Sequence, residues 1–203
     1  MKPGRLLMIF CCSLFFLAGI SSVSGAAEEE KVDEILLLPP QMEGGKPLME
    51  ALAQRRTTRV MREDSISDQD LSNLLWAAWG VNRPDGGFRT VPTARNKQNA
   101  ALFVAFERGV WRYEAVDNKL VKVSVVDFRP IFHSAPLILI YAGEDAPYSE
   151  MHIGSMYQNV GLYCASAGLA NVVKQSGLGN LKDAFPLPEG YKIFVIQYVG
   201  LPK

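Results

Sequence analysis

The sequence predicts an α+β domain in which helices surround a mixed, mainly antiparallel sheet. Apolar runs at Ala101–Phe106, Val110–Tyr113 and Leu120–Val126 are separated by short turns, which is typical of consecutive antiparallel strands. Two stripes of apolar residues spaced three and four apart predict helices before and after these strands. About 177 of the 203 residues follow the N-terminal leader described next, enough for one substantial core, and we expect a single domain.

The N-terminus has the order of a secretory signal peptide. Lys2 and Arg5 precede the apolar run Leu6–Ile20, and small residues dominate Ser21–Ala27. The apolar run is shorter than the roughly 20 residues that a bilayer-spanning helix needs. We therefore interpret residues 1–26 as a signal peptide and expect a secreted or periplasmic protein without stable membrane insertion. An uncleaved membrane anchor is the alternative.

Removal of this segment changes the cysteine count and the charge. Cys11 and Cys12 lie within it, so the mature chain keeps only Cys164 and can form no internal disulfide. Without Lys2 and Arg5, 19 basic residues face 21 acidic ones, a net charge of −2. A nucleic-acid-binding face usually shows a basic excess, and we expect no nucleic-acid partner.

Residues 27–46 predict an extended arm, because prolines and glycines interrupt their short aliphatic stretch. In the domain at residues 47–203, a first helix follows Pro47 and ends at Arg55 and Arg56. Ser67-Asp68-Gln69-Asp70 resembles a capping box with Asp for Glu and predicts a second helix that closes at Gly80. Val81–Ala100 shows no obvious element, and a loop of that length is usually functional or disordered.

The rest of the domain completes the sheet and its covering helix. Pro136–Ala142 is nearly all apolar, which predicts a central strand buried on both faces. Ile153–Ala167 predicts a helix of small residues that stops at Gly168. The sequence further predicts a strand at Asn171–Lys174, a short helix at Leu178–Ala184 and a last strand at Ile193–Val199.

Two segments could carry a binding function. Arg55-Arg56-Thr57-Thr58-Arg59 gathers three guanidinium groups, which suit anionic oxygens, although such a run can also be a solvated helix end. In the long loop, Asn96 and Gln98 would project to the same side of an extended backbone, where amides can read a heteroaromatic edge. Both are also ordinary loop residues. A third segment, Gly168–Val173, lacks the glycine spacing of a dinucleotide-binding turn.

Other candidates fit structural roles better. His133 and His152 are the only histidines, and no spacing of ligand residues resembles a zinc or iron site. We expect Trp76 and Trp79 to be core or interface residues and Cys164 to be a small buried residue.

In this order and spacing, the segments resemble motifs of the nitroreductase superfamily of FMN-dependent oxidoreductases, particularly its compact SagB-type dehydrogenases. The family's R-R-S-x-R segment corresponds to Arg55–Arg59, and its P-S-x-x-N-x-Q loop corresponds to Pro92–Gln98, each with Thr in place of Ser. The start of its long interface helix and the glycine turn that follows correspond to Tyr157–Ala170. The similarity covers roughly residues 47–203.

The resemblance implies a three-layer fold and a homodimer that holds FMN at its interface. Arg55, Arg56, Thr57 and Arg59 would hold the FMN phosphate, its ribityl chain and the pyrimidine side of the ring. Asn96 and Gln98 would address the ring and the substrate side, and Val173 and Lys174 would approach the central ring. No side chain need act as an acid or base, because the flavin carries the redox chemistry.

Two functions follow from these implications. The first is an exported FMN-dependent oxidoreductase that passes electrons from a reduced donor, such as NAD(P)H, to a small organic acceptor. The alternative is a non-catalytic dimeric module of the same fold that binds flavin or another ligand. The short C-terminus at Lys203 favours the module, whereas the three clustered arginines favour the enzyme.

Overall fold

A seven-stranded sheet forms the centre of the computed structural model, which describes residues 33–132, 135–181 and 184–203. Every neighbouring pair of strands is antiparallel, in the order β1-β6-β5-β4-β7-β9-β8. The strands are β1 (Glu34–Leu36), β4 (Ala100–Phe106), β5 (Gly109–Glu114), β6 (Lys119–Ser124), β7 (Leu137–Glu144), β8 (Ala170–Lys174) and β9 (Tyr191–Gly200). The predicted signal peptide, residues 1–26, lies outside the described residues, as does the beginning of the 27–46 arm.

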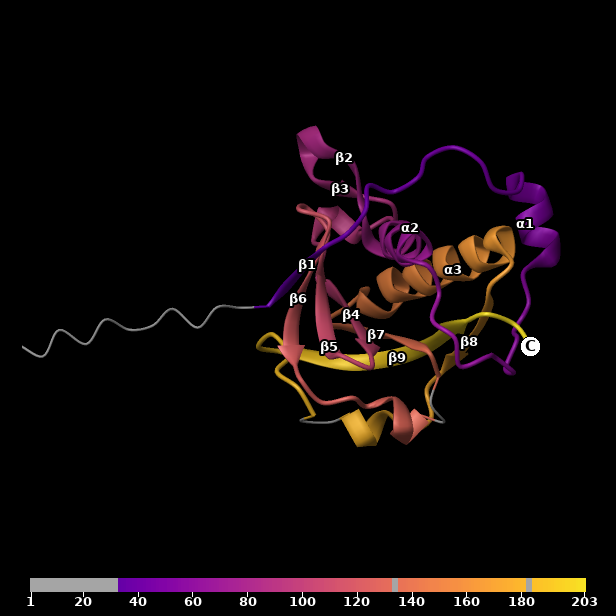
Figure 1. The fold of residues 1–203 in the computed structure, drawn as a ribbon. Helices are drawn as coiled ribbons and strands as arrows, with labels where there is room; N and C mark the ends of the chain where they lie inside the picture. The colour runs from indigo at the N-terminus through magenta and orange to yellow at the C-terminus, as the bar shows by residue number, and fades with distance from the viewer. Residues whose placement is uncertain (1–32, 133–134, 182–183) are drawn as a thin grey trace, which may run out of the picture. The chain divides into compact units, whose positions relative to one another are not determined.

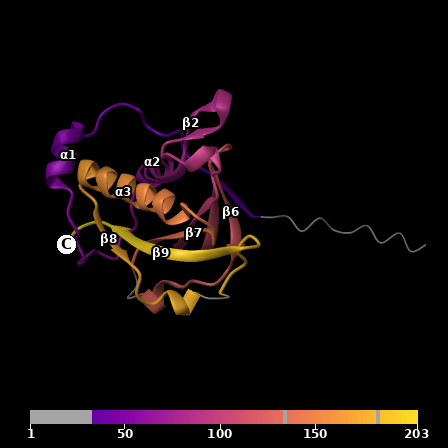
Figure 2. The ribbon, with the colours of Figure 1, turned by 180° about the vertical axis from the view of Figure 1, so that it is seen from behind.

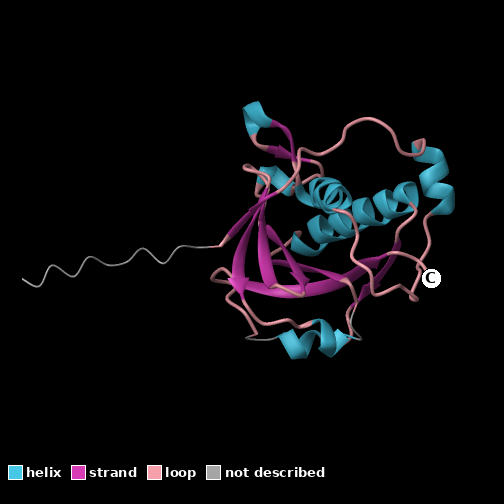
Figure 3. Ribbon diagram, in the orientation of Figure 1, coloured by secondary structure: helices cyan, strands magenta, loops and turns pink. Residues whose placement is uncertain are grey.

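Helices cover one face of this sheet, and short 3-10 turns cover the other (Figures 1 and 3). The helical layer consists of α1 (Leu48–Gln54), α2 (Asp68–Trp79) and α3 (Ser149–Ala167). The opposite layer contains η3 (Arg129–Phe132) and η4 (Leu178–Leu181). The view from behind shows the same three layers (Figure 2), and the predicted α+β class is therefore confirmed.

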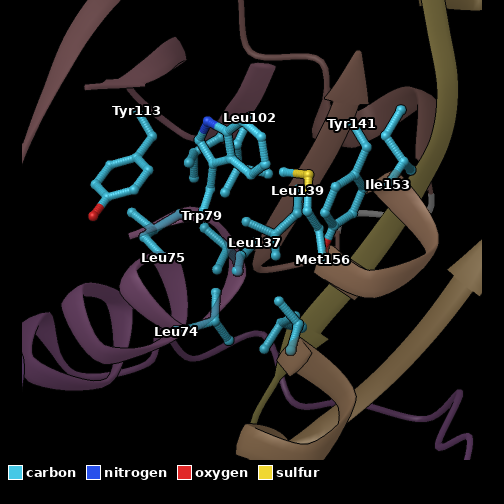
Figure 4. Packing of buried hydrophobic residues seen from close by; sticks show 14 of the residues in the cluster. Leu74, Leu75, Trp79, Leu102, Tyr113, Leu137, Leu139, Tyr141, Ile153 and Met156 are labelled. Carbon is cyan, nitrogen blue, oxygen red and sulfur yellow. The ribbon is translucent and has the colours of Figure 1, made fainter. Parts of the chain in front are cut away.

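The apolar core follows from the two-residue period of the central strand β7. Leu137, Leu139 and Tyr141 face the helices, where they pack with residues of α2 and α3 (Figure 4). Ile138 and Ile140 alternate with them and pack under the 3-10 turns. The predicted central strand is confirmed, because all five side chains are buried and β7 has a strand on each side.

Helix α2 begins and ends where the sequence predicts. The Ser67 hydroxyl accepts a hydrogen bond from the Asp70 backbone N–H at 3.0 Å and donates to the Asp70 carboxylate at 2.6 Å. At the other end the Gly80 N–H donates to the Trp76 carbonyl. A Cβ at Gly80 would lie 2.3 Å from Trp76 Cδ1, so close packing requires glycine there.

Residues 81–100 contain more structure than the sequence indicates. A small hairpin, β2 (Val81–Arg83) and β3 (Phe88–Arg89), encloses the turn η1 (Pro84–Gly86), and η2 (Ala94–Asn96) follows. Strands of two or three residues are too short to show periodicity. The expectation of a loop without elements is therefore wrong for this segment.

The described part of the N-terminal arm begins with a short strand. Its residues 34–36 form β1 at one edge of the sheet, paired with β6. The Leu38 carbonyl then accepts hydrogen bonds from the side chains of Ser72 and Asn118, which fix the arm across α2. No helix of the described residues is both long and apolar enough to cross a membrane.

Candidate functional site

The chain after α1, which carries the arginine segment, bonds to the start of strand β8 and to the residues that follow β9. After α1 ends, the Thr58 N–H donates to the Asn171 carbonyl at 2.8 Å, and the Arg62 N–H donates to the Leu201 carbonyl at 2.9 Å. A bridge between Met61 and Pro202 completes the contact. The backbone is thus fixed by main-chain bonds, which leaves the side chains of the segment free for other partners.

Those side chains are exposed and carry uncompensated charge. None of the ion pairs between described residues includes Arg55, Arg56 or Arg59, although nearby Arg62 pairs with Asp64 at 3.1 Å. Exposed guanidinium groups without an ion-pair partner create a positive potential that attracts anions. The segment therefore has the electrostatics of an anion-binding site.

Cavities adjoin β8 on both faces of the sheet. On the helical side, a cavity of about 530 Å³ is lined by Arg55, Arg56 and Asn171. On the opposite side, one of about 800 Å³ is lined by Arg59 and Lys174. The structure therefore divides the arginines between two cavities, and Thr57 lines neither of them.

A third cavity lies farther along the helical side, towards the first turns of α3. It has a volume of about 490 Å³ and is lined by Tyr157 of α3 and Phe194 of β9. Val173 lines both this cavity and the 800 Å³ cavity, and its side chain is 37% exposed. An apolar side chain that is open on an edge strand can pack against a flat ligand.

A buried chain of hydrogen bonds supports β8 beneath Arg55. The Tyr141 hydroxyl donates to Gln197 Oε1 at 2.6 Å, and Gln197 Nε2 donates to Asn171 Oδ1 at 3.1 Å. Asn171 is 5% exposed, and its Nδ2 has no hydrogen-bond partner among the described residues. This donor therefore remains available at the 530 Å³ cavity.

Two further residues of this region have defined environments. Lys174 Nζ donates to the Tyr198 hydroxyl at 3.3 Å and lies 4.9 Å from the centre of that ring. Cys164 is buried at the 530 Å³ cavity, where burial raises the pKa of its thiol and keeps it protonated. Cys164 is thus a packing residue, as predicted, and not a thiolate nucleophile.

The loop with Asn96 and Gln98 adopts a different backbone from the extended one expected. Arg95, Asn96 and Gln98 have φ angles of 53°, 54° and 48°, in the left-handed region. Gln98 Nε2 donates to both the Gly87 carbonyl and Asn96 Oδ1 at 2.8 Å, and Arg89 Nε donates to Gln98 Oε1 at 2.7 Å. Within this chain Gln98 therefore ties the loop to the β2–β3 hairpin, while Asn96 is exposed.

The predicted site residues form two groups at different positions along α3. Arg55 packs against Gly161, whereas the loop contacts His152, nine residues earlier in the helix. At about 1.5 Å per residue, these positions are about 14 Å apart along the helix axis. The structure thus brings the arginines, Val173 and Lys174 together around β8 and holds Asn96 and Gln98 towards the other end of α3.

This arrangement matches a known family. A profile of the Nitroreductase family matches residues 52–201, about three quarters of the chain. The chain belongs to the nitroreductase family.

Relatives of this nitroreductase-family protein agree with that assignment. It is 27% identical over 152 residues to a candidate nitroreductase of Methanocaldococcus jannaschii, covering 62% of this chain and 76% of the relative. A crystal structure of a candidate nitroreductase from Ralstonia eutropha JMP134 superposes with a TM-score of 0.78 at 32% identity, covering 84% of this chain and 90% of that one. The oxidoreductase class and the fold are therefore shared.

A more distant structure agrees in fold alone. The nitroreductase from Bacteroides fragilis NCTC 9343, solved with bound FMN, superposes with a TM-score of 0.54 at 13% identity. That comparison covers 78% of this chain and 89% of the other.

Sequence reasoning missed two residues of this nitroreductase-family site. Asn171 was expected only as the start of a strand, and its buried side chain shows no sequence signal. His152 was considered only as a metal ligand, yet it binds the loop. The described residues contain no group of three or more potential metal ligands, and His133 lies outside them.

Proposed function

We propose that this protein binds FMN along β8 and uses it to pass electrons from a reduced donor to a small organic acceptor. The observation that carries the proposal is the position of three arginines, which have no ion-pair partner among the described residues, beside the edge strand β8. The same strand exposes the side chain of Val173. Related folds support it, because the Bacteroides fragilis structure contains FMN and a Clostridium difficile relative is described as an FMN-dependent nitroreductase. The motifs further favour the SagB-type subgroup.

The residues of the site fit the chemistry of FMN. A phosphate needs cations or N–H donors, and Arg55, Arg56 and the free Asn171 Nδ2 meet at one cavity. The cavities of about 490–800 Å³ fall within the range of about 300–1,000 Å³ that is usual for small-molecule sites. Charge, donors and space are therefore all present.

Each residue would have a distinct task in this site. Arg55, Arg56 and Thr57 would bind the phosphate and the ribityl chain, and Arg59 would bind the polar pyrimidine edge. Val173 and Lys174 would lie against the ring system. When bound, FMN supplies the redox chemistry by accepting a hydride from the donor and reducing the acceptor. The protein orients the reactants and needs no acid or base of its own.

The proposal includes a homodimer. Asn96 and Gln98 lie apart from the arginines within one chain, so a second copy could bring its loop to the first copy's β8. Helix α1 also leaves Leu48, Met49 and Leu52 exposed at 63%, 75% and 42%, which is unusual for neighbouring apolar residues on one short helix. A partner chain over this surface would bury them.

We further propose export, on the basis of Lys2, Arg5 and the apolar run after them. Cleavage of residues 1–26 would release the protein to the periplasm or the medium. Sequencing the N-terminus of the protein recovered from its native host tests this directly. A mature chain that begins at Met1 would contradict export by cleavage.

The function is tested by flavin retention and turnover. The purified protein is incubated with FMN, desalted and scanned from about 350 to 500 nm for the absorption bands of the bound flavin. We expect close to one FMN per chain and reduction of a nitroaromatic or quinone in the presence of a reduced donor. Retention without turnover for any donor would favour the non-catalytic ligand-binding module.

Substitutions assign the flavin to this site. Arg55→Ala and Arg59→Ala should each weaken FMN binding by about 1.5–3 kcal/mol, the usual contribution of a charge-assisted hydrogen bond. This corresponds to about 10- to 150-fold in Kd. Arg108→Ala is the control, because Arg108 is exposed at the β4–β5 turn and lines neither β8 cavity. Equal losses in all three variants would refute the assignment of Arg55 to the phosphate and of Arg59 to the pyrimidine edge.

A further inference from the structure

The loop at residues 92–98 stores backbone strain. Arg95, Asn96 and Gln98 all have left-handed φ angles although none is glycine. Such a conformation costs roughly 1–2 kcal/mol for an ordinary residue and less for Asn. Strained segments persist only where surrounding contacts hold them. The contacts that hold this loop therefore determine how Asn96 is presented.

His152 makes the central contact. The Ala94 backbone N–H donates to His152 Nε2 at 2.8 Å, so this ring nitrogen acts as an acceptor and carries no proton. The ring proton is then on Nδ1, which lies 2.9 Å from Asn99 Oδ1 and donates to it. His152 thus binds the loop only as the neutral Nδ1-protonated tautomer.

Asn99 fixes that tautomer through its hydrogen bond to the other ring nitrogen, Nδ1. Its Nδ2 lies 3.1 Å from Ser149 Oγ and 3.3 Å from a carboxylate oxygen of Glu144, and only an amide nitrogen can donate to a carboxylate. Asn99 Oδ1 must therefore point at the imidazole. His152 and Asn99 are each 3% exposed, and Ser149 is fully buried. The network has no room to rearrange without cost.

Among the described residues, no ion pair or hydrogen bond joins a carboxylate to the His152 ring, so no direct partner stabilises its protonated form. The charged groups nearest in sequence or contact are Glu144 on β7, Glu150 on α3, and Arg95 and Lys97 on the loop. None of the ion pairs between described residues includes His152, and the Glu144 carboxylate reaches it only through Asn99. A second ring proton would face the Ala94 N–H directly, so two donors would oppose each other.

We propose that neutral His152 is a positioning residue that holds the 92–98 loop in its left-handed conformation, and that its protonation releases the loop. The consequence for flavin rests on the proposed function, in which Asn96 addresses the ring of FMN. The anchoring of the loop rests on the hydrogen bonds alone. Its expected pH range follows from the ring's environment.

Burial lowers the pKa of His152 below its usual value of about 6.5. Between the lowered native pKa and the unfolded-state pKa of His152, the native protein therefore binds fewer protons than the unfolded chain. Stability from this contact is complete above about pH 6.5 and decreases as the pH falls to the lowered native pKa. Opening of the loop should therefore become progressively easier as the pH falls through this range.

Trypsin provides a test that needs no flavin, because Arg95 and Lys97 are exposed cleavage sites on the loop itself. Two variants separate the bonds of the ring. His152→Gln can keep an uncharged acceptor near the Ala94 N–H, whereas His152→Asn can keep the donor to Asn99 but not that acceptor. We expect cleavage after Arg95 or Lys97 to be about fivefold or more faster in H152N at pH 7.5, and close to wild type in H152Q.

The pH dependence of the cleavage rate adds a second measurement, because a residue with only a structural role would not make cleavage pH-dependent. Between pH 7.5 and 5.5, wild-type cleavage should accelerate relative to a peptide substrate that corrects for trypsin activity, and H152Q should show no such acceleration. Equal cleavage rates in H152Q and H152N would overturn the proposal. If either variant fails to fold, hydrogen exchange at the Ala94 amide of the unmodified protein gives the pH dependence: its protection, corrected for the intrinsic exchange rate, should fall between pH 7.5 and 5.5, and constant protection would overturn the proposal.

Flavin titration then separates this inference from the proposed function. FMN affinity should fall about tenfold in H152N and stay within about twofold of wild type in H152Q. If the trypsin pattern is as expected but no variant retains FMN, His152 anchors the loop and the cofactor assignment is wrong. If FMN binds equally to H152N and wild type, the link between the loop and flavin is refuted.

Discussion

Substitutions of Gly161 on α3 should change the stability of the protein and its affinity for FMN in predictable ways. A Cβ placed there would lie 3.7 Å from both Cγ and Cδ of Arg55 and 3.9 Å from Asn171 Oδ1, which are ordinary contact distances. Gly161→Ala therefore removes a flexible residue from a helix interior without a clash. We expect a gain of about 0.5–1 kcal/mol in the free energy of unfolding, or about 1–4 °C in Tm.

A larger side chain at the same position should have the opposite functional effect. With C–C bonds of about 1.5 Å, the methyl carbons of leucine lie about 2.5 Å beyond Cβ, which is enough to overlap the methylene groups of Arg55. Gly161→Leu should therefore displace Arg55 and weaken FMN binding by about as much as Arg55→Ala, while Gly161→Ala leaves FMN binding unchanged.

Urea denaturation and FMN titration of the two variants give both numbers. Gly154→Ala is the matched control, because Gly154 lies in the same helix and its Cβ would meet only Tyr157, at 3.7 Å. It should gain a similar amount of stability. A loss of more than 1 kcal/mol in Gly161→Ala but not in Gly154→Ala would refute the packing argument, and normal FMN affinity in Gly161→Leu would refute the role of Arg55.

Two further predictions concern stability. Tyr141→Phe removes the donor to buried Gln197 Oε1, so it should cost about 1–3 kcal/mol, measured by urea denaturation with exposed Tyr148→Phe as the control. An unchanged midpoint would show that the buried chain beneath β8 contributes nothing. Ser67→Ala removes the cap of α2 and should cost about 1 kcal/mol, and Ser67→Thr should recover most of it; equal losses in both would contradict the capping assignment.

The elements that were predicted correctly are those that a local pattern defines. Helix α2 has its capping serine, an apolar stripe and a glycine stop, and the structure places it at Asp68–Trp79. Strand β7 has a continuous apolar run and lies at the centre of the sheet. In both cases the local sequence pattern alone determines which side chains of the element are buried.

The boundaries that differ are set by contacts distant in sequence. Helix α3 begins at Ser149, four residues before the predicted start at Ile153. Its first turn is fixed by the contacts of Ser149 and His152 with Asn99, some 50 residues earlier. The predicted helix Leu178–Ala184 is a 3-10 turn at Leu178–Leu181, Ala184 is not helical, and residues 182–183 lie outside the described residues. No local pattern encodes such contacts.

The candidate site also has features that the sequence predicts and features that it does not. The arginines could be identified because clustered cations are visible in a sequence. Their separation into two cavities could not, since it depends on where the Thr58 N–H bonds to β8: Arg55 and Arg56, before that bond, line one cavity, and Arg59, after it, lines the other. The orientation of the Asn171 side chain likewise depends on Gln197, whose Nε2 donates to Asn171 Oδ1 from a strand position 26 residues later in the chain.

The arginine segment has a second consequence, for solubility. A sheet with open edges can add strands from other molecules, and natural proteins protect those edges. Here β1 is only three residues long, and Lys119 and Lys122 of the adjacent strand form ion pairs with Glu34 and Asp33. At the other edge, the backbone N–H groups of Thr58 and Arg62 bond to the carbonyls of Asn171 on β8 and of Leu201. This places the cationic arginine segment beside the edge strand. The segment that carries the proposed ligand-binding arginines therefore also protects this edge of the sheet against strand addition, and its variants should be tested for solubility as well as for affinity.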